Sequence, residues 1–429
     1  MHDIAEIRKD PERFRRGLAR KGFGPEGIDD LLRLEAGQRA LLQKVEALRA
    51  RQNAASKAIA EKKRAGQPAD DLLAEMKGVK AEETALGREL AEAEERLQKA
   101  LRGIPNLPDD DVPDGKSTEE NVEVSRWGDP PKFDFPPKAH WDLGAALGIL
   151  DAEAAGKMSG SGFTLLLGDG ARLERALGQF LLDQTTKVHG YLEVSPPVLV
   201  RPAALDATTI LAKYEDQMYR QRDDDLYLIP TAETPLTNLH RDAVLDADRL
   251  PLRYSALTNC FRREAGAAGR DTRGMLRVHQ FWKVEMMTFA HPDRSNEEHE
   301  RMRGNAEAAL RALGLPYRVV KVCTGDMSAA NRRQYDLEAW AAGCGKWLEV
   351  SSVSNFGDWQ ARRAGTRCRS GKEKPRFVHT LNGSALGMPR TLVALLENNQ
   401  RADGGVAVPG ALRPYLGGQE ALGPAGKRG

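Results

Sequence analysis

Between about residue 27 and residue 100, apolar side chains recur every seven residues. The two series are Leu34, Leu41 and Leu48, then Leu72, Val79 and Leu86. The segment AGQPA (65–69) between them contains Gly and Pro, which end a helix and allow a turn. Seven-residue apolar spacing on two long helices joined by a short turn predicts an antiparallel coiled-coil hairpin.

The pattern changes after residue 139, where short apolar runs alternate with amphipathic segments. The runs predict strands over 191–200, 226–233, 253–264, 279–289, 317–323 and 346–354. Amphipathic periodicity predicts helices over 171–190, 295–314 and 384–400. Strands at hairpin-like spacing with helices between them indicate an α+β domain built on a mainly antiparallel sheet.

Composition along the chain predicts four parts. A helical arm occupies residues 1–110, and a linker rich in Pro, Asp and Gly follows at 111–139. The globular domain extends over 140–418. We expect residues 419–429 to form a flexible tail, because they carry no apolar periodicity.

The predicted strand at 279–289 carries polar side chains where a sheet normally carries apolar ones. Its alternation puts one set of side chains on each face: His279, Phe281, Lys283 and Glu285, against Trp282, Val284 and Met286. The charged face must line a cavity if it is buried, because unpaired buried charge is costly. With Arg262 and Glu264 ending the preceding strand, such a face suits a nucleoside triphosphate and a small zwitterion. The alternative is a hairpin with a solvated, salt-bridged face.

Composition limits the classes of protein. The chain has 429 residues, a hydrophobic fraction of 41% and a formal net charge of +2, so any nucleic-acid contact must come from local patches. No apolar run is long enough to span a bilayer and the N-terminus lacks a signal-peptide pattern. The four cysteines lie far apart, so we expect neither a zinc site nor a disulfide scaffold, and a reducing, cytoplasmic location.

The first predicted helix of the hairpin carries a local excess of basic residues. They include Arg49, Arg51, Lys57, Lys62, Lys63 and Arg64. A solvated charged face is usual for a coiled coil. A basic arm that follows a nucleic-acid backbone is the alternative, and these residues alone leave both open.

Six segments in order resemble the bacterial type of seryl-tRNA synthetase, a class II aminoacyl-tRNA synthetase. They are GYLEVSPPVLV, LYLIPTAETPLTNLHRD, CFRREAGAAGRDTRGMLRVHQFWKVE, TGDMSAANRRQYDLEAW, LEVSSVSNFGDWQARR and FVHTLNGSALGMPRTLVALLEN. The resemblance implies a class II antiparallel sheet flanked by helices, a homodimer, and an arm that binds tRNA. It also implies ATP-dependent activation of L-serine with Mg²⁺ and transfer to tRNA(Ser), and also to tRNA(Sec).

The resemblance assigns roles to matching positions of this sequence. Arg262 and Arg390 are the implied catalytic residues. The implied ATP-binding residues are Arg262, Arg263, Glu264, Phe281, Glu349, Val350, Ser351, Ser352 and Arg390. The implied serine-binding residues are Thr231, Ala232, Glu233, Arg262, Glu285, Asn382 and Ser384. Glu349 and Ser352 are the implied magnesium ligands, and the basic residues of the arm are the implied tRNA contacts.

The sequence departs from the family pattern at several places. Gly162 stands where an Arg is usual, and the segments 207–212 and 385–389 differ from the usual loop and helix start. Pro389 raises the possibility that the helix bearing Arg390 is shifted. Two alternatives therefore stay open: an enzyme that activates serine for a biosynthetic pathway without tRNA, and a non-catalytic tRNA-binding regulator.

Overall fold

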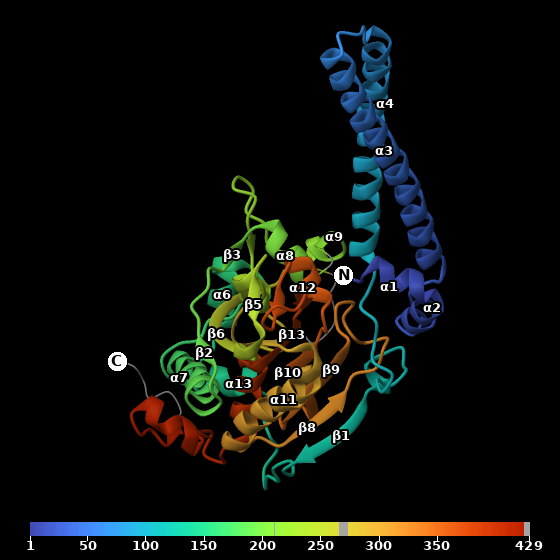
Figure 1. The fold of residues 1–429 in the computed structure, drawn as a ribbon. Coiled ribbons are helices and arrows are strands. Elements are labelled where there is room, and N and C mark those ends of the chain that lie inside the picture. The colour runs from blue at the N-terminus through green and yellow to red at the C-terminus, as the bar shows by residue number, and fades with distance from the viewer. Residues whose placement is uncertain (210, 266–272, 424–429) are drawn as a thin grey trace. The chain divides into compact units, whose positions relative to one another are not determined.

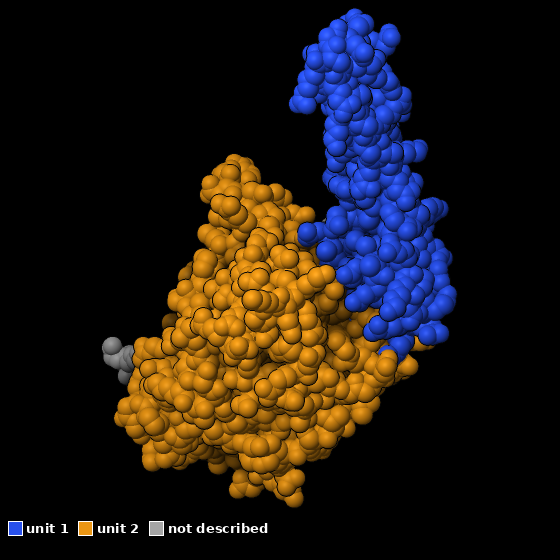
Figure 2. Space-filling view, viewed as in Figure 1, with its two compact units in different colours: residues 1–105 blue, residues 106–429 orange. Residues whose placement is uncertain are grey.

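The computed structural model describes residues 1–209, 211–265 and 273–423 (Figure 1). The chain divides into two compact units, residues 1–105 and residues 106–429, which Figure 2 shows in different colours. The first unit ends five residues before the boundary expected from composition. Among the described residues, no helix has both the length and the apolar character needed to cross a membrane.

The first unit is entirely helical. Its helices are α1 (Ile4–Lys9), α2 (Pro11–Ala19), α3 (Glu26–Arg64) and α4 (Asp70–Gly103). The last two pack against each other along their lengths, so the predicted hairpin of long helices is confirmed. Val45 and Ile59 on α3 and Val79 and Leu97 on α4 are buried between them. Each such side chain stabilises the hairpin by roughly 1.5–3 kcal/mol.

The second unit is built on a sheet of eight strands in the order β1-β8-β9-β10-β13-β7-β6-β2. Their bounds are β1 (Val122–Trp127), β2 (Leu192–Glu193), β6 (Leu252–Phe261), β7 (Gln280–Ala290), β8 (Tyr317–Lys321), β9 (Arg333–Ala341), β10 (Lys346–Asn355) and β13 (His379–Gly387). All neighbours are antiparallel except β2, which runs parallel to β6. The expected α+β class with an antiparallel sheet is confirmed.

Shorter strands form three small sheets beside the large one. They are β3 (Leu199–Val200) with β4 (Tyr227–Leu228); β5 (Val244–Asp246) with β11 (Arg367–Arg369) and β12 (Arg376–Phe377); and β14 (Val406–Ala407) with β15 (Ala421–Leu422). The last pair places Leu422 in the core. The expectation of a flexible segment from residue 419 is therefore wrong for residues 421–422, and residues 424–429 lie outside the described part of the chain.

Helices cover both faces of the large sheet (Figure 1). The helices of this unit are α5 (His140–Ala146), α6 (Ala152–Ser159), α7 (Asp169–Asp183), α8 (Pro202–Thr208), α9 (Leu211–Tyr214), α10 (Glu233–Thr237), α11 (Ser295–Ala312), α12 (Trp359–Ala364) and α13 (Met388–Asn398). One core joins Val284 and Met286 of β7 to α7, α11 and α13. A second core joins Met287 and Phe289 of β7 to α10 and α12. Glu285, two residues before Met287, therefore lies on the face that carries α10 and α12.

Two expectations about elements need correction. The predicted linker at 111–139 contains β1, an edge strand that pairs with β8 through residues such as Val122 and Trp127. Its short run of alternating charged and apolar residues, typical of an edge, gave only a weak strand signal. The helix predicted over 384–400 begins at Met388, because Ser384–Gly387 belong to β13. Small residues in that strand face close neighbours and mask its period.

Candidate active site

A cavity of about 650 Å³ opens above the centre of the sheet. Strands β7, β10 and β13, the residues that follow β6 and the start of α13 supply its walls. Thirteen of the residues implied by the sequence line it: Thr231, Glu233, Arg262, Glu264, Phe281, Glu285, Glu349, Val350, Ser351, Ser352, Asn382, Ser384 and Arg390. Two do not. Ala232 is fully buried behind the wall, and Arg263 points away, with its guanidinium donating to the Asp216 carbonyl at 3.2 Å.

Strand register explains why these residues meet. Phe281, Lys283 and Glu285 follow the two-residue period of β7, so all three face the cavity. Ser384 of β13 lies opposite Glu285 in the antiparallel ladder. The alternation predicted from the sequence is therefore confirmed for this strand. His279 is the exception, because it lies before β7 and its ring stacks on Phe163.

One end of the cavity is a buried network of charge and hydroxyl groups. Lys283 forms an ion pair with Glu285 and donates to Thr231 Oγ1 at 2.8 Å. Thr231 in turn donates to Glu285 Oε2 at 3.1 Å. Asn382 donates to the other oxygen of Glu285 at 2.8 Å. A carboxylate held this way is a fixed acceptor of the size and polarity that suit a hydroxyl or ammonium group.

A second carboxyl group, Glu233, lies behind this network. Asn382 donates to it at 2.9 Å and Gln360 at 2.6 Å, and Thr380 fixes the Gln360 amide at 2.8 Å. Burial raises the pKa of Glu233 to about 7, and the neighbouring Glu285 carboxylate adds to the effect. A cation bound between the two carboxyl groups reverses that penalty, so this end of the cavity favours an ammonium group.

The other end of the cavity presents guanidinium groups and a ring. The Arg262 guanidinium lies 5.1 Å from the centre of the Phe281 ring and donates to the Pro230 carbonyl at 3.3 Å. Glu264 has a φ of 49° and forms an ion pair with Arg277. This left-handed conformation turns the Glu264 backbone sharply just after β6. Exposed arginine beside an aromatic face suits phosphate and a planar base.

Arg390 enters the cavity from the first turn of α13. It donates to the Leu276 carbonyl at 3.1 Å and to the Glu349 carbonyl at 3.0 Å, and its Nη1 lies 3.4 Å from Glu349 Oε2. Pro389 occupies the start of the helix, where a missing N–H group costs nothing. The substitution at this position therefore leaves the helix intact.

Oxygen groups on β10 and β9 meet beside Arg390. Glu349 and Ser352 both line the cavity, with a bulge between residues 349 and 351 that turns successive side chains inward. Asp336 is buried opposite Ser352, and burial, followed by repulsion from Glu349, raises its pKa well above the ordinary value. Carboxylate and hydroxyl oxygens crowded in this way fit a hard divalent cation, so the donor set suits Mg²⁺.

The other departures from the family pattern fall near the cavity. Gly162 has a φ of 81°, and a Cβ atom there lies 2.4 Å from the His279 ring, so a side chain does not fit while the ring holds this position. Ala207 is buried, and the Thr209 carbonyl accepts from Arg363 at 3.2 Å. Ile210 lies outside the described residues, and the side chain of Ala212 is not described.

Sequence reasoning gave no role to three groups of the site. Lys283 was visible from the alternation of β7, but its partners come from segments far away in the chain. Gln360, on α12, supports Glu233, and Asp336 lies behind the magnesium candidates. No local pattern marks either residue, because each acts through a contact between distant elements.

The basic residues of α3 divide into two groups. Arg49 donates to Glu83 at 2.9 Å and Arg51 pairs with Glu75, both on α4. Lys57, Lys62, Lys63 and Arg64 are exposed at the end of the helix. The positive charge of the second group is therefore more accessible to a ligand than that of Arg49 and Arg51, which pair with glutamates of α4.

Comparison with known proteins identifies the family. Two domain families match the chain: "Seryl-tRNA synthetase N-terminal domain" over residues 1–108 and "tRNA synthetase class II core domain (G, H, P, S and T)" over residues 214–399. The serine–tRNA ligase of Roseiflexus castenholzii is 50% identical over 423 residues, covering 98% of this chain and 99% of that protein. The chain belongs to the seryl-tRNA synthetase family.

Solved structures of the seryl-tRNA synthetase family show the same fold. The enzyme from Pyrococcus horikoshii, complexed with ATP, matches with a TM-score of 0.94 and 38% identity, covering 99% of this chain and 100% of that one. The cytoplasmic serine–tRNA ligase from Naegleria fowleri, in complex with AMP, matches with a TM-score of 0.88 and 29% identity, covering 99% of each chain.

Proposed function

We propose that this protein is a serine–tRNA ligase that forms seryl-adenylate from L-serine and ATP and transfers the seryl group to tRNA(Ser). The observation that carries the proposal is the cavity that joins a buried carboxylate network to an arginine-and-ring platform. Relatives named serine–tRNA ligase, at about half identity over nearly the whole chain, support it.

Serine occupies the network end of the cavity in this proposal. Its ammonium group lies near Thr231 and Glu233, and its hydroxyl donates to Glu285. Alanine leaves the Glu285 carboxylate without that partner, which is why the site rejects it strongly. Threonine is excluded by shape, from the side of Asn382 and Ser384, and this filter is weaker because one methyl group is worth only about 1–3 kcal/mol.

ATP occupies the arginine end. Phe281 stacks on the adenine, Glu264 accepts from its amino group, and the strand residues Val350 and Ser351 border the nucleotide. Arg262 binds the α-phosphate together with the serine carboxylate, and Arg390 reaches the terminal phosphate. Guanidinium groups suit these roles because they offer paired donors. For Arg263 the geometry favours support of the loop near Asp216 over contact with ATP.

Mg²⁺ is held by Glu349 and Ser352 in this proposal. The ion supplies charge neutralisation for the phosphates. Arg390, beside Glu349, serves the same electrostatic purpose from the protein side.

The first step is an in-line displacement on ATP. A carboxylate oxygen of serine forms a bond to the α-phosphorus, and the bond from that phosphorus to pyrophosphate breaks. In the second step a hydroxyl group of the terminal tRNA ribose attacks the seryl carbonyl, loses its proton, and releases AMP. No protein nucleophile is needed, so Arg262 and Arg390 contribute through positioning and charge.

The remaining partners follow from the same proposal. The exposed cations at the end of α3 contact the tRNA backbone, and tRNA(Sec) is a second acceptor. We propose that the protein acts as a homodimer in the cytoplasm and needs no zinc.

Two assays test the proposal. Pyrophosphate exchange into ATP that depends on serine, and seryl-tRNA formation with tRNA(Ser), are the expected results for the pure protein. Exchange without charging of any tRNA indicates instead an enzyme that activates serine for biosynthesis. Binding of tRNA without exchange indicates a regulator, and either result overturns the proposal.

A further inference from the structure

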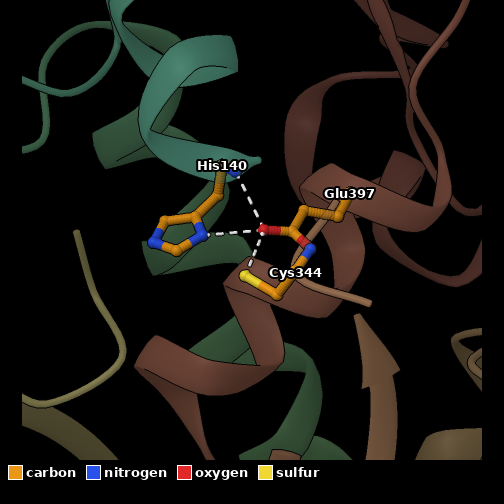
Figure 3. A group of neighbouring side chains, drawn as sticks. All are labelled: His140, Cys344 and Glu397. Atoms are coloured by element: carbon orange, nitrogen blue, oxygen red, sulfur yellow. Dashed lines mark hydrogen bonds and ion pairs between the residues drawn. The ribbon is translucent and has the colours of Figure 1, made fainter. Parts of the chain in front are cut away.

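Three side chains that do not line the cavity lie together (Figure 3). His140 begins α5, Glu397 lies near the end of α13, and Cys344 lies between β9 and β10. Both the backbone N–H and Nδ1 of His140 approach Glu397 Oε1, at 2.9 and 2.8 Å. Cys344 approaches the same carboxylate through its backbone N–H at 2.8 Å and its Sγ at 3.1 Å.

The three groups resemble a set of metal ligands, since their ligand atoms lie within 4.8 Å of one another. The histidine ring argues against that use. The backbone N–H of Met275 donates to His140 Nε2 at 3.0 Å, so Nε2 carries a lone pair and Nδ1 carries the proton. A protonated Nδ1 donates to Glu397 and has no lone pair for a metal ion.

The fixed ring links two walls of the active site. Gly274 has a φ of 64° and passes so close to the ring that a Cβ atom there lies 2.1 Å from His140 Nε2. Beside it, the Arg273 guanidinium lies 4.5 Å from the centre of the Trp141 ring. The first two residues of α5, His140 and Trp141, therefore hold residues 273–275 in place by a hydrogen bond and by ring contacts.

The segment that His140 holds continues directly into the nucleotide wall. Met275 and Leu276 line the cavity, and the Leu276 carbonyl accepts from Arg390 Nε at 3.1 Å. Arg390 lies on α13, and the same helix carries Glu397. The Glu397 carboxylate accepts the hydrogen bond from Nδ1 of His140, on the side of the ring opposite Met275. The His140 ring thus connects residues 273–276 with α13. The spacing between these two elements sets the position of the Arg390 guanidinium.

The carboxylate end of this link is charged. Burial raises the pKa of Glu397, but the hydrogen bonds from His140 and Cys344 outweigh burial and leave the pKa below its ordinary value. A charged acceptor makes the bonds to His140 stronger than neutral ones. His140 and Glu397 are both fully buried, so water does not compete.

We propose that His140 is a positioning residue for adenylate formation, which sets the Leu276 carbonyl and through it the guanidinium of Arg390. The inference rests on the proposed function, because it assigns Arg390 to ATP. His140 touches no substrate in this scheme. Its effect is therefore expected on ATP and on the rate of activation, and not on the binding of serine.

Two conservative substitutions separate the two sides of the ring. His140→Asn places an amide near the Nδ1 position, which keeps the bond to Glu397 and loses the bond to Met275. His140→Gln places an amide near the Nε2 position and does the reverse. We expect H140N to lower kcat of pyrophosphate exchange by about 10- to 100-fold and to raise KM for ATP, since a shift near 1 Å has effects of this order. For H140Q we expect changes within about threefold, because Glu397 on α13 keeps its bonds from the backbone N–H of residue 140 and from Cys344 while the bond to Met275 is retained.

Two further variants complete the experiment. Gly274→Ala displaces the ring from the other side and is expected to reproduce the loss seen in H140N. Cys344→Ser keeps a donor for Glu397 and is the matched control, with kinetics close to those of the wild type. All variants are assayed as the full chain, well below their unfolding temperatures measured by circular dichroism.

The outcomes distinguish the inference from the function. Wild-type protein without serine-dependent exchange overturns the proposed function. Active wild type with normal kinetics in H140N and G274A overturns the positioning role. Equal losses in H140N and H140Q, with KM for serine and ATP changed alike, also overturn it, because a purely structural residue behaves in that way. If H140N does not fold, G274A alone decides.

Discussion

At the scale of single residues, each cation that the described residues place in the cavity wall already has an acidic or carbonyl partner. Lys283 pairs with Glu285, Arg277 with Glu264, and Arg390 contacts Glu349. The Lys283–Glu285 pair is buried, and pairing keeps its charges tolerable when no ligand is present, because an unpaired charge in the same place is expensive. The Arg277 and Arg390 pairs are partly exposed. The chemistry of the site therefore depends on which member of each pair a substrate takes over.

Glu285→Gln tests the proposed contact with the serine hydroxyl. The amide offers a neutral acceptor in place of a charged one, so we expect kcat/KM for serine to fall by about 100-fold, the worth of a charge-assisted hydrogen bond. We expect kcat/KM for alanine to change less, so the ratio of kcat/KM for serine to kcat/KM for alanine becomes smaller. Pyrophosphate exchange with each amino acid gives the ratio.

The control for this prediction is Glu373→Gln, which makes the same chemical change at an exposed position. A serine-to-alanine ratio in E285Q equal to that of the wild type contradicts the assignment. Circular dichroism at the assay temperature confirms that Lys283, left without its ion pair, does not unfold the variant.

Glu233 makes stability depend on pH. Its pKa of about 7 in the folded chain exceeds the ordinary value of 4.5, so the folded state binds the proton more tightly. The resulting stabilisation, roughly 3 kcal/mol, is fully present below pH 4.5 and is lost as the pH rises through 7. We expect Tm of Glu233→Gln relative to the wild type to increase between pH 5 and pH 8. A constant difference contradicts the assignment.

At the scale of elements, the predictable features are those written in local periodicity. The hairpin of α3 and α4 follows from leucine spacing and the Gly-Pro turn, and the cavity face of β7 follows from the alternation of Phe281, Lys283 and Glu285. Strands β1, β9 (Arg333–Ala341) and β13 (His379–Gly387) were not among the predicted strands. For β1 and the end of β13 the reason is that an edge strand and a run of small residues carry weak periods. Gln360 and His140 were missed because their partners lie far away in sequence.

The ion pairs between the hairpin helices predict unequal roles for the basic residues of α3. Arg49 and Arg51 are neutralised by Glu83 and Glu75, whereas the cations at 62–64 are exposed. We expect the triple change Lys62→Gln, Lys63→Gln and Arg64→Gln to raise KM for tRNA and to lower its salt dependence by about one unit of slope for each lost phosphate contact. Pyrophosphate exchange stays unchanged.

The matched control carries the same charge change on the other helix of the hairpin, at Lys77, Lys80 and Arg88, which are exposed. Replacing Arg49 and Arg51 by Gln is expected to have a smaller effect on tRNA than the triple change. If the α4 control and the α3 variant weaken charging of tRNA equally, the contact surface is not specific to α3.

At the scale of the whole molecule, the two units have separate cores and different spectroscopic reporters. All six tryptophans lie in residues 106–429, and the first unit is helical throughout. Tryptophan fluorescence therefore reports on the catalytic unit alone. Far-ultraviolet circular dichroism reports on the helices of both units, of which α3 and α4 are the longest.

We expect thermal unfolding followed by the two signals to give different midpoints, because a chain with two cores need not unfold in one step. ATP with serine is expected to raise the fluorescence midpoint and to shift only the part of the helical transition that comes from residues 106–429, since a ligand stabilises the part that binds it. Coincident transitions that shift together with ligand contradict two independent units.

The partner-rich cavity has a consequence for turnover. A substrate that enters finds few charged or hydrogen-bonding groups without a partner. Each contact that it makes with such a group replaces a contact that the group already had within the protein. The net gain on association is then the difference between two similar sets of interactions, so even a polyanion is held only moderately. Such an exchange favours ready departure of AMP and pyrophosphate, the products that the two proposed steps must release before the next turnover.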